Sequence, residues 1–199
     1  MSDVRMPTQK RSIEKRNRII EKGFELMCEN GYYTTTIPDI AKYSEVSVGI
    51  IYQYFNDKKD IFIEGVKNYA NTIMYPMLNI SENETIKIDN LKSILENMID
   101  KFIKTHTISK KAHEELIAMS HLDNDVADIF KRSELDMTKK IVTLFENNNF
   151  HIANCSEKVH IAYNMIDNLC HEIVYHKHDK INYHIMKKEI IEIIVNLLK

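Results

Sequence analysis

Apolar residues along this chain recur at the spacing of a helix, and they nowhere alternate with polar residues as in a half-buried strand. The stripe formed by Leu91, Leu95, Met98 and Phe102 repeats every three or four positions. The same period predicts helices over residues 13–30, 57–76, 88–102, 109–120, 123–147, 156–177 and 183–198. Only 4 glycines and 3 prolines occur in 199 residues, so few turns are available. The sequence therefore predicts an all-α protein.

Residues 34–58 have a different pattern, which predicts two short helices separated by a tight turn. Thr36 is placed to cap the first helix, with Asp39 three residues on as its capping-box partner. Pro38 falls in the first helical turn, where a missing N–H costs nothing. Residues 44–46 form the turn, and Ser47 is placed to cap the second helix. This arrangement is typical of a helix-turn-helix that places its second helix in the DNA major groove.

Residues 10–62 resemble the DNA-binding domain of the TetR family of bacterial transcriptional repressors. The resemblance rests on an ordered set of features: a leading helix over 13–30, the Gly31-Tyr32-Tyr33 break, the run Thr35-Thr36-x-x-x-Ile40-Ala41, Val46-Ser47-x-Gly49, Tyr52-x-Tyr54-Phe55, and Lys58 before an apolar helix. Glu45 stands where the family usually has glycine. A left-handed conformation there costs on the order of 1 kcal/mol for a residue with a side chain. The glycine of the break, Gly31, is expected to end the leading helix as a left-handed C-cap.

The resemblance implies a three-helix DNA-binding domain followed by a helical domain for ligand binding and dimerisation. We place the first at residues 1–56, with a disordered arm at 1–9, and the second at 57–199. The helix beginning at Asp57 would link the two and end near Pro76. The family further implies a homodimer that binds a palindromic operator in double-stranded DNA and releases it when a small molecule binds.

The second helix of the motif would present its side chains to DNA bases. Gln53 can pair with adenine through two hydrogen bonds, and Val48 and Ile50 can touch thymine methyl groups. Ile51 and Phe55 are expected in the core, whereas Tyr52 suits either the core or a phosphate contact. The predicted DNA-contacting residues are Lys10, Arg11, Thr36, Ser47, Val48, Gly49, Ile50, Tyr52, Gln53, Tyr54 and Lys58.

Charge is unevenly distributed in a chain of net charge −2. Residues 5–22 are rich in Lys and Arg, which suits either phosphate neutralisation or an ordinary solvated helix face. Residues 43–57 hold no Lys or Arg, so phosphate attraction must come from Lys10, Arg11, Lys58 and helix N-termini. We therefore expect modest affinity per half-site and a need for dimerisation.

The last helix, 183–198, is apolar almost all round, and a second copy of the chain is its expected cover. The helix from 156 carries a neutral polar stripe that suits an interface, a cavity wall or a wet face: His160, Asn164, Asn168, His171 and Tyr175. Met and Phe in the middle helices are either plain core or the lining of an adaptable pocket for a neutral apolar effector. The predicted ligand-binding residues are Met98, Phe102, Phe130, Met137 and Asn168.

Other chemistries find little support in the residues. His171 and His176 are spaced i, i+5, whereas a helical metal pair needs i, i+4, so we expect no metal site and no cofactor. With no phosphate loop or nucleophile elbow, an enzyme is not expected. Three cysteines without paired spacing and no signal-peptide pattern predict a cytoplasmic protein, and no apolar run is long enough for a membrane span. The alternative function is a helical interaction module that no longer recognises DNA.

Overall fold

A computed structural model of the chain describes residues 7–70, 87–108 and 110–199, and these ranges contain helices and no strand. The all-α prediction is therefore confirmed. The helices are α1 (Lys10–Asn30), α2 (Ile37–Tyr43), α3 (Val48–Tyr52), α4 (Lys58–Tyr69), α5 (Ile88–Ile108), α6 (Lys110–Leu122), α7 (Asn124–Asn147), α8 (Cys155–Val174) and α9 (Tyr183–Leu197). The predicted helix end at Pro76 lies outside the described residues.

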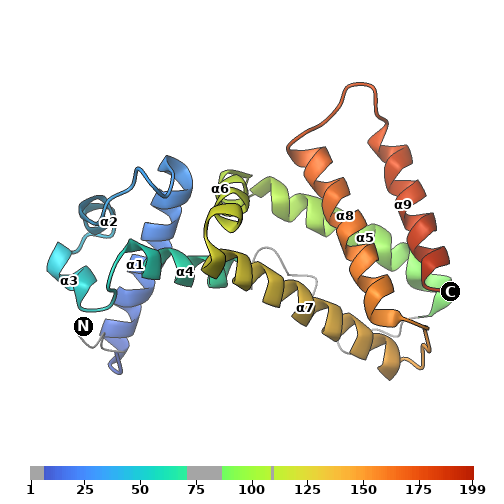
Figure 1. The fold of residues 1–199 in the computed structure, drawn as a ribbon, viewed down its shortest axis with the longest axis horizontal. Coiled ribbons are helices and arrows are strands. Elements are labelled where there is room, and N and C mark those ends of the chain that lie inside the picture. Colours follow the sequence, from blue (N-terminus) through green and yellow to red (C-terminus); the bar gives the residue numbers. More distant parts are fainter. Residues whose placement is uncertain (1–6, 71–86, 109) are drawn as a thin grey trace. The chain divides into compact units, whose positions relative to one another are not determined.

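The helices form two compact units, each with its own core (Figure 1). The first unit holds the chain up to Ala70 together with Lys111–Phe130, and the second holds the remainder. Helix α4 belongs to the first unit, although we expected the helix from Asp57 to open the second domain. The two compact units are defined by packing, whereas the boundary predicted after residue 56 separates two functions. That functional boundary therefore stays a prediction.

In the first unit, α1 packs closely along α4. Ile19 and Met27 of α1 are fully buried, as are Ile61 and Phe62 of α4. The approach is so tight that a Cβ atom at Gly65 would lie 2.4 Å from the ring of Phe24. Any larger residue at position 65 would therefore push the two helices apart.

Helix α1 ends at Gly31, whose φ of 92° is the positive angle we expected. Its ψ of 142°, however, lies outside the left-handed helical region, so the prediction of a left-handed cap was wrong in detail. The chain leaves the helix extended, in a conformation essentially reserved for glycine. Thr35 then folds back, with its hydroxyl donating to the Gly31 carbonyl at 2.9 Å.

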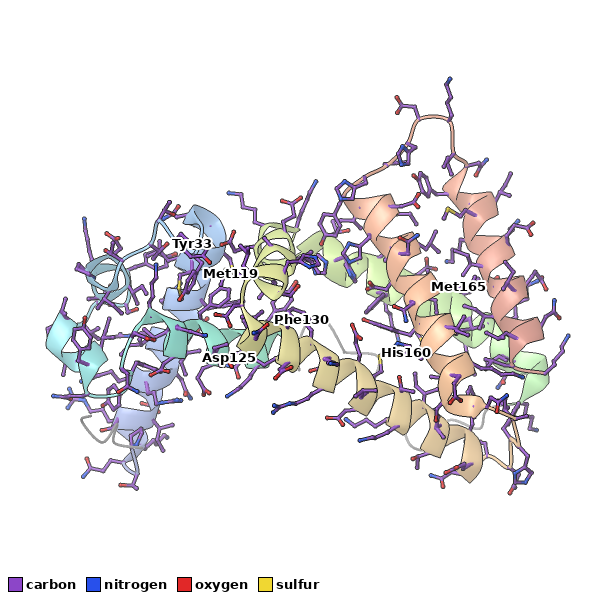
Figure 2. All side chains as sticks on the ribbon, viewed as in Figure 1. Tyr33, Met119, Asp125, Phe130, His160 and Met165 are labelled. Carbon is purple, nitrogen blue, oxygen red and sulfur yellow. The ribbon has the colours of Figure 1, made fainter. Side chains whose placement is uncertain are left out.

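Helix α6 and the first turn of α7 are tied to this unit by polar contacts. The backbone N–H of Tyr32 donates to Glu115 Oε1 at 2.6 Å. The ammonium group of Lys59 lies 2.7 Å from one carboxylate oxygen each of Asp123 and Asp125. Asp125 and Met119 mark this region in Figure 2. Parts of the chain that are far apart in sequence are thus joined to the helix-turn-helix region.

In the second unit, α8 and α9 run side by side in opposite directions, and α5 packs against both (Figure 1). The core they share is apolar, with Ile99 and Phe102 of α5, Ile166 and Leu169 of α8, and Ile194 of α9 almost fully buried. The predicted stripe on the 88–102 helix is therefore its buried face.

The same unit leaves large apolar side chains in solvent. Ile185 and Ile193 of α9 are 54% and 49% exposed, and Ile161 of α8 is 50% exposed. The polar stripe predicted on α8 divides: Asn164 and Asn168 are exposed, while the histidines of the stripe are half-buried. The exposed surface of α8 and α9 is consequently a mixture of isoleucine, amide and charged residues.

Candidate nucleic-acid interface and ligand cavity

Helix α2 begins with the capping box that the sequence predicts. The N–H of Asp39 donates to Thr36 Oγ1 at 3.4 Å, and the N–H of Thr36 donates to Asp39 Oδ2 at 3.0 Å. Hydrogen bonds from Thr36 lower the pKa of the Asp39 carboxyl group, because they favour its ionised form. Pro38 lies within the first turn, as expected. These contacts fix the start of the helix without using its exposed face.

The turn between α2 and α3 closes around Glu45. This residue has a φ of 56°, so it does adopt the left-handed conformation that glycine takes with less strain. The N–H of Val46 donates to the Ala41 carbonyl at 2.9 Å and completes the turn. The Glu45 carboxylate extends into solvent, 3.7 Å from the Arg18 guanidinium. The motif therefore forms with a glutamate at this position.

Helix α3 presents one face to its own core and another to solvent. Ile51 and the following Phe55 are buried, which confirms their predicted core role. Tyr52 is 52% exposed, so it is not a core residue. Of the other predicted contact residues here, Ser47, Val48, Gly49 and Gln53 are exposed, and Ile50 and Tyr54 are half-buried.

Two details of α3 bear on what could approach it. Ser47 occupies the N-cap position, but its side chain accepts no hydrogen bond from the helix, so its hydroxyl can face another molecule. A Cβ atom at Gly49 would meet nothing closer than Ser47 Oγ at 4.0 Å. Packing within the chain does not require glycine here. A bare backbone does permit close approach of a groove wall.

Lys58 has a structural position that the sequence did not reveal. Its ammonium group donates to the carbonyl oxygens of Tyr32 at 2.6 Å, Thr35 at 2.9 Å and Tyr33 at 3.4 Å. It also lies 4.5 Å from the centroid of the Tyr32 ring. Lys58 thus pins the break after α1 to the start of α4. The predicted phosphate contacts of Lys58 and Thr36 remain predictions. The same holds for Lys10 and Arg11, which are exposed at the start of α1.

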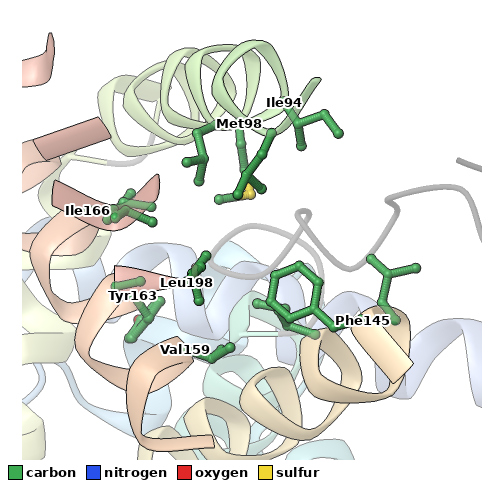
Figure 3. Close-up of a pocket in the computed structure, with 13 residues that line it drawn as sticks. Ile94, Met98, Phe145, Val159, Tyr163, Ile166 and Leu198 are labelled. Atoms are coloured by element: carbon green, nitrogen blue, oxygen red, sulfur yellow. The ribbon is translucent and has the colours of Figure 1, made fainter. Parts of the chain in front are cut away.

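The second unit contains a small apolar cavity of about 60 Å³ that is partly open to solvent (Figure 3). Its lining comes from four helices and their ends: Leu91, Ile94, Leu95 and Met98 from α5, Ile141, Leu144 and Phe145 from α7, Val159, Ala162, Tyr163 and Ile166 from α8, and Ile194 and Leu198 from α9 and its C-cap. The lining has no charged side chain, so the cavity suits an apolar molecule.

Only Met98 of the predicted ligand-binding residues lines this cavity. Phe102 is fully buried and packs edge-on against His106, with ring centroids 4.6 Å apart. Met137 is also fully buried, and Phe130 lies on α7 within the first unit (Figure 2). Asn168 is exposed, with Nδ2 3.4 Å from Glu172 Oε1. Periodicity identified buried faces but could not show which of them surround empty space.

Comparison with known proteins supports the first unit most strongly. The family model described as bacterial regulatory proteins, tetR family, matches residues 19–64. The HTH-type transcriptional regulator HbdR of Aromatoleum sp. is 51% identical over 59 residues, which cover 30% of this chain and 26% of HbdR. The biofilm operon icaADBC negative transcriptional regulator IcaR of Staphylococcus aureus is 26% identical over 163 residues, covering 72% of this chain and 86% of IcaR.

Solved structures support the fold of the whole chain. A TetR-family transcriptional regulator from Mesorhizobium loti matches with a TM-score of 0.73 and 14% identity, covering 96% of this chain and 98% of that one. A transcriptional regulator from Saccharomonospora viridis, solved in complex with choline, matches with a TM-score of 0.67 and 20% identity, covering 92% and 96%. Among the described residues, no helix has the length and apolar content needed to cross a membrane.

Proposed function

We infer the role of this chain from one premise, which is that it belongs to the TetR family of bacterial DNA-binding transcriptional regulators. Members of the family are transcription factors and not enzymes. We propose that this member is a repressor, as IcaR is by its name. In this proposal a homodimer occupies a palindromic operator and leaves it when a neutral apolar molecule binds. The observation that carries the proposal is the exposed face of α3 on a buried Ile51–Phe55 anchor.

DNA readout is proposed for the exposed side chains of α3. Gln53 directly follows the last residue of α3. Its side chain is exposed, so the amide is available to pair with adenine. Val48 and Ile50 would contact thymine methyl groups. Phosphate contacts are proposed for Lys10 and Arg11, and for the Tyr52 hydroxyl. Residues 1–56 would therefore bind DNA, and 57–199 would bind the ligand and a second subunit.

Dimerisation is proposed through α8 and α9. Ile161, Ile185 and Ile193 are each about half exposed on these two neighbouring helices, and exposed apolar side chains of this kind suit an interface. Burying them against a second copy would remove that surface from water and would cover the amides of Asn164 and Asn168 with polar partners. A two-fold dimer would hold two α3 helices for successive major grooves, about 34–36 Å apart.

The effector is proposed to bind in the cavity of the second unit. The regulator from Saccharomonospora viridis holds choline, which is a cation. A buried cation needs a carboxylate or an aromatic cage, whereas this lining offers only Tyr163 and Phe145 as aromatic residues and no carboxylate. A neutral molecule with a hydrocarbon chain or ring fits the lining better.

Helix α7 gives a physical route from the cavity to the helix-turn-helix unit. Ile141, Leu144 and Phe145 of α7 line the cavity. The first turn of the same continuous helix carries Asp125, which pairs with Lys59 of α4. A ligand that binds more tightly to one position of α7 would favour one arrangement of these contacts. By reciprocity, the same ligand would weaken operator binding, and the operator would weaken ligand binding.

Fluorescence anisotropy with labelled duplexes tests the proposed function. The probe is the DNA upstream of the gene that encodes this chain, cut into overlapping duplexes, with unrelated DNA in excess as competitor. One duplex should bind at least about 10³-fold more tightly than unrelated DNA. A neutral apolar compound that stabilises the protein should then release it. If every duplex binds no better than the competitor, a helical interaction module becomes the better description.

A further inference from the structure

One buried and two half-buried side chains of types that can bind metals lie together in the second unit, and none of them lines the cavity. It comprises His106 of α5 and Asp167 and His171 of α8. His106 Nε2 lies 3.8 Å from Asp167 Oδ1, and His171 Nε2 lies 3.6 Å from Asp167 Oδ2. Ring nitrogens of the two histidines lie within 4.8 Å of each other. The two histidines, from different helices, thus each approach a different oxygen of the same carboxylate.

Hydrogen bonding fixes which nitrogen of His106 carries the proton. Nδ1 lies 2.9 Å from the carbonyl oxygen of Phe102. A carbonyl oxygen only accepts, so Nδ1 must donate. In the neutral ring this leaves Nε2 with a lone pair, on the side of Asp167. Histidine ligands of metals commonly have this arrangement, with the far ring nitrogen donating to a backbone carbonyl.

One carboxylate oxygen of the cluster has no hydrogen bond. Asp167 Oδ1 is buried and has no hydrogen-bond partner among the described residues. A buried carboxylate oxygen without a donor is unfavourable unless a cation or another hydrogen-bond donor joins it.

A neighbouring carboxyl group is half-buried as well. Burial raises the pKa of Glu134 on α7, and the charge of Asp167 raises it further. His160, the other half-buried histidine of α8, acts in the opposite direction and lowers the pKa of Glu134. No lysine or arginine side chain is recorded within ion-pair distance of Asp167 in the described part of the chain. The only basic side chains within ion-pair distance of Asp167 in the described part of the chain are therefore histidines.

We propose that His106 Nε2, the Asp167 carboxylate and His171 Nε2 bind one divalent transition-metal ion, with Zn²⁺ the best match. Tetrahedral Zn²⁺ has bonds of about 2.0–2.2 Å, which place ligand atoms roughly 3.3 Å apart. The two His–Asp separations of 3.6 and 3.8 Å are close to that value, and side-chain rotations would bring the two histidine nitrogens, which lie within 4.8 Å of each other, to the same spacing. Two imidazoles exclude Mg²⁺ and Ca²⁺, which prefer oxygen ligands. Three protein ligands leave the fourth position to water or another small ligand.

Spacing on α8 and a second contact between the helices support the site. Asp167 and His171 are i, i+4 and share one face of the helix. The hydroxyl of Tyr175, one turn further on, donates to the backbone carbonyl of His106 at 3.1 Å. This bond holds the ligand-bearing turn of α5 beside α8. The sequence-based expectation of no metal site considered histidine pairs alone, whereas this proposal includes a carboxylate.

Metal binding would join the two helices that supply most of the cavity wall. Met98 of α5 and Ile166 of α8 line the cavity, and each lies within eight residues of a ligand of the proposed site. Binding to the folded state alone stabilises it by an amount that grows with the logarithm of metal concentration above the Kd. The inference does not depend on DNA binding, so it stands or falls separately from the proposed function.

Calorimetric titration of tag-free, chelator-treated protein with Zn²⁺ tests the site. Wild type should bind one Zn²⁺ per chain with a Kd of about 1 μM or tighter. Asp167→Asn keeps the shape of the side chain and removes the buried charge, so it should fold normally, and it should weaken binding at least about 100-fold. His171→Asn should act in the same direction. His178→Asn, which changes an exposed histidine in the turn after α8, is the matched control and should bind as wild type does.

Two further measurements keep the result clear. Co²⁺ in place of Zn²⁺ should give the intense visible bands of a four-coordinate ion in wild type and lose them in Asp167→Asn. Circular dichroism of each apo variant checks that its helices are formed. Fewer than one Zn²⁺ per chain in wild type, or an Asp167→Asn variant with unchanged affinity, would overturn the proposal. If a histidine variant fails to fold, the Zn²⁺ affinity of Asp167→Asn alone decides whether the proposed site exists.

Discussion

The ammonium nitrogen of Lys58 lies 2.6 Å from the carbonyl oxygen of Tyr32, and so joins two segments that are 26 residues apart. The same nitrogen also reaches the carbonyl of Thr35 at 2.9 Å. These oxygens follow the end of α1, where the chain has no helical donors left to offer them. Lys58 therefore contributes to the fold of the DNA-binding unit, whether or not it also meets a phosphate.

Replacing Lys58 by methionine should lower the free energy of unfolding by about 1.5–3 kcal/mol, the range for hydrogen bonds to a charged group. Chemical denaturation followed by circular dichroism measures this, and Lys42→Met on exposed α2 surface is the control. The salt dependence of DNA binding decides the phosphate role. A lost phosphate contact reduces the slope by about one, whereas a purely structural role leaves it unchanged. A Lys58→Met variant as stable as Lys42→Met would contradict the structural role.

The thiols should differ sharply in reactivity and should make the protein sensitive to alkali. Burial raises the pKa of Cys28 and of Cys170 to about 12. At pH 8 only about one in 10⁴ of each is thiolate, so a thiol reagent should label half-buried Cys155 first. Because the folded-state pKa is raised, the stability contribution is present below the usual 9.0 and is lost as pH rises from 9.0 towards about 12.

Two measurements check the thiol prediction. Labelling kinetics at pH 8 should show one faster thiol, and unfolding midpoints should fall as the pH rises from 9.0 towards about 12. Cys28→Ala and Cys170→Ala in one chain should flatten that fall. Three equal labelling rates in the native protein would mean that these sites open far more readily than their burial indicates.

Charge on the exposed face of α9 should break the proposed dimer. Replacing Ile185 and Ile193 by glutamate would place two desolvated carboxylates in the interface, which is unfavourable without cationic partners. Light scattering should show wild type as a dimer and the double variant as a monomer, with operator affinity reduced as well. Leu122→Glu, at an exposed position at the end of α6, is the control and should stay dimeric. A dimeric double variant would place the interface elsewhere.

Filling the cavity should remove the response to effector and spare DNA binding. Ala162 lies in the cavity wall, so Ala162→Leu adds side-chain volume where space exists and should cost less than about 1 kcal/mol of stability. Effector affinity should fall at least about tenfold. Ala41→Leu, in the packed helix-turn-helix core, is the comparison and should cost about 1–3 kcal/mol. Unchanged affinity in Ala162→Leu, measured by thermal shift with the same compound, would exclude this cavity as the effector site.

Local rules allowed much of this structure to be predicted from sequence, because caps and amphipathic faces depend on residues a few positions apart. The Thr36–Asp39 box and the core role of Ile51 are of this kind. The same local rules also give the cost of a left-handed Glu45, and Glu45 does have a positive φ. Gly31 shows the limit, since its φ followed from its lack of a side chain but its ψ depends on where Thr35 packs.

The features that escaped prediction join residues far apart in sequence. Lys58 reaches carbonyl oxygens across 23 residues or more, and Tyr32 meets Glu115 across 83. The cavity is lined by side chains from four helices. It exists because these side chains do not fill the space between the helices completely. Helical periodicity correctly made Phe102 a buried residue, but it does not distinguish a side chain that packs against His106 from one that faces a void.

The most direct test of the account is base readout by Gln53. Wild type and Gln53→Ala are compared by anisotropy on the operator and on operators in which each A·T pair is replaced in turn. Gln9→Ala, which removes an amide at the start of α1, is the control and should leave base preference unchanged. We predict that Gln53→Ala costs about 1–3 kcal/mol on the operator and abolishes the preference at one A·T pair of each half-site. A Gln53→Ala variant with the full wild-type preference at every position would contradict the assignment of α3 as the reading helix.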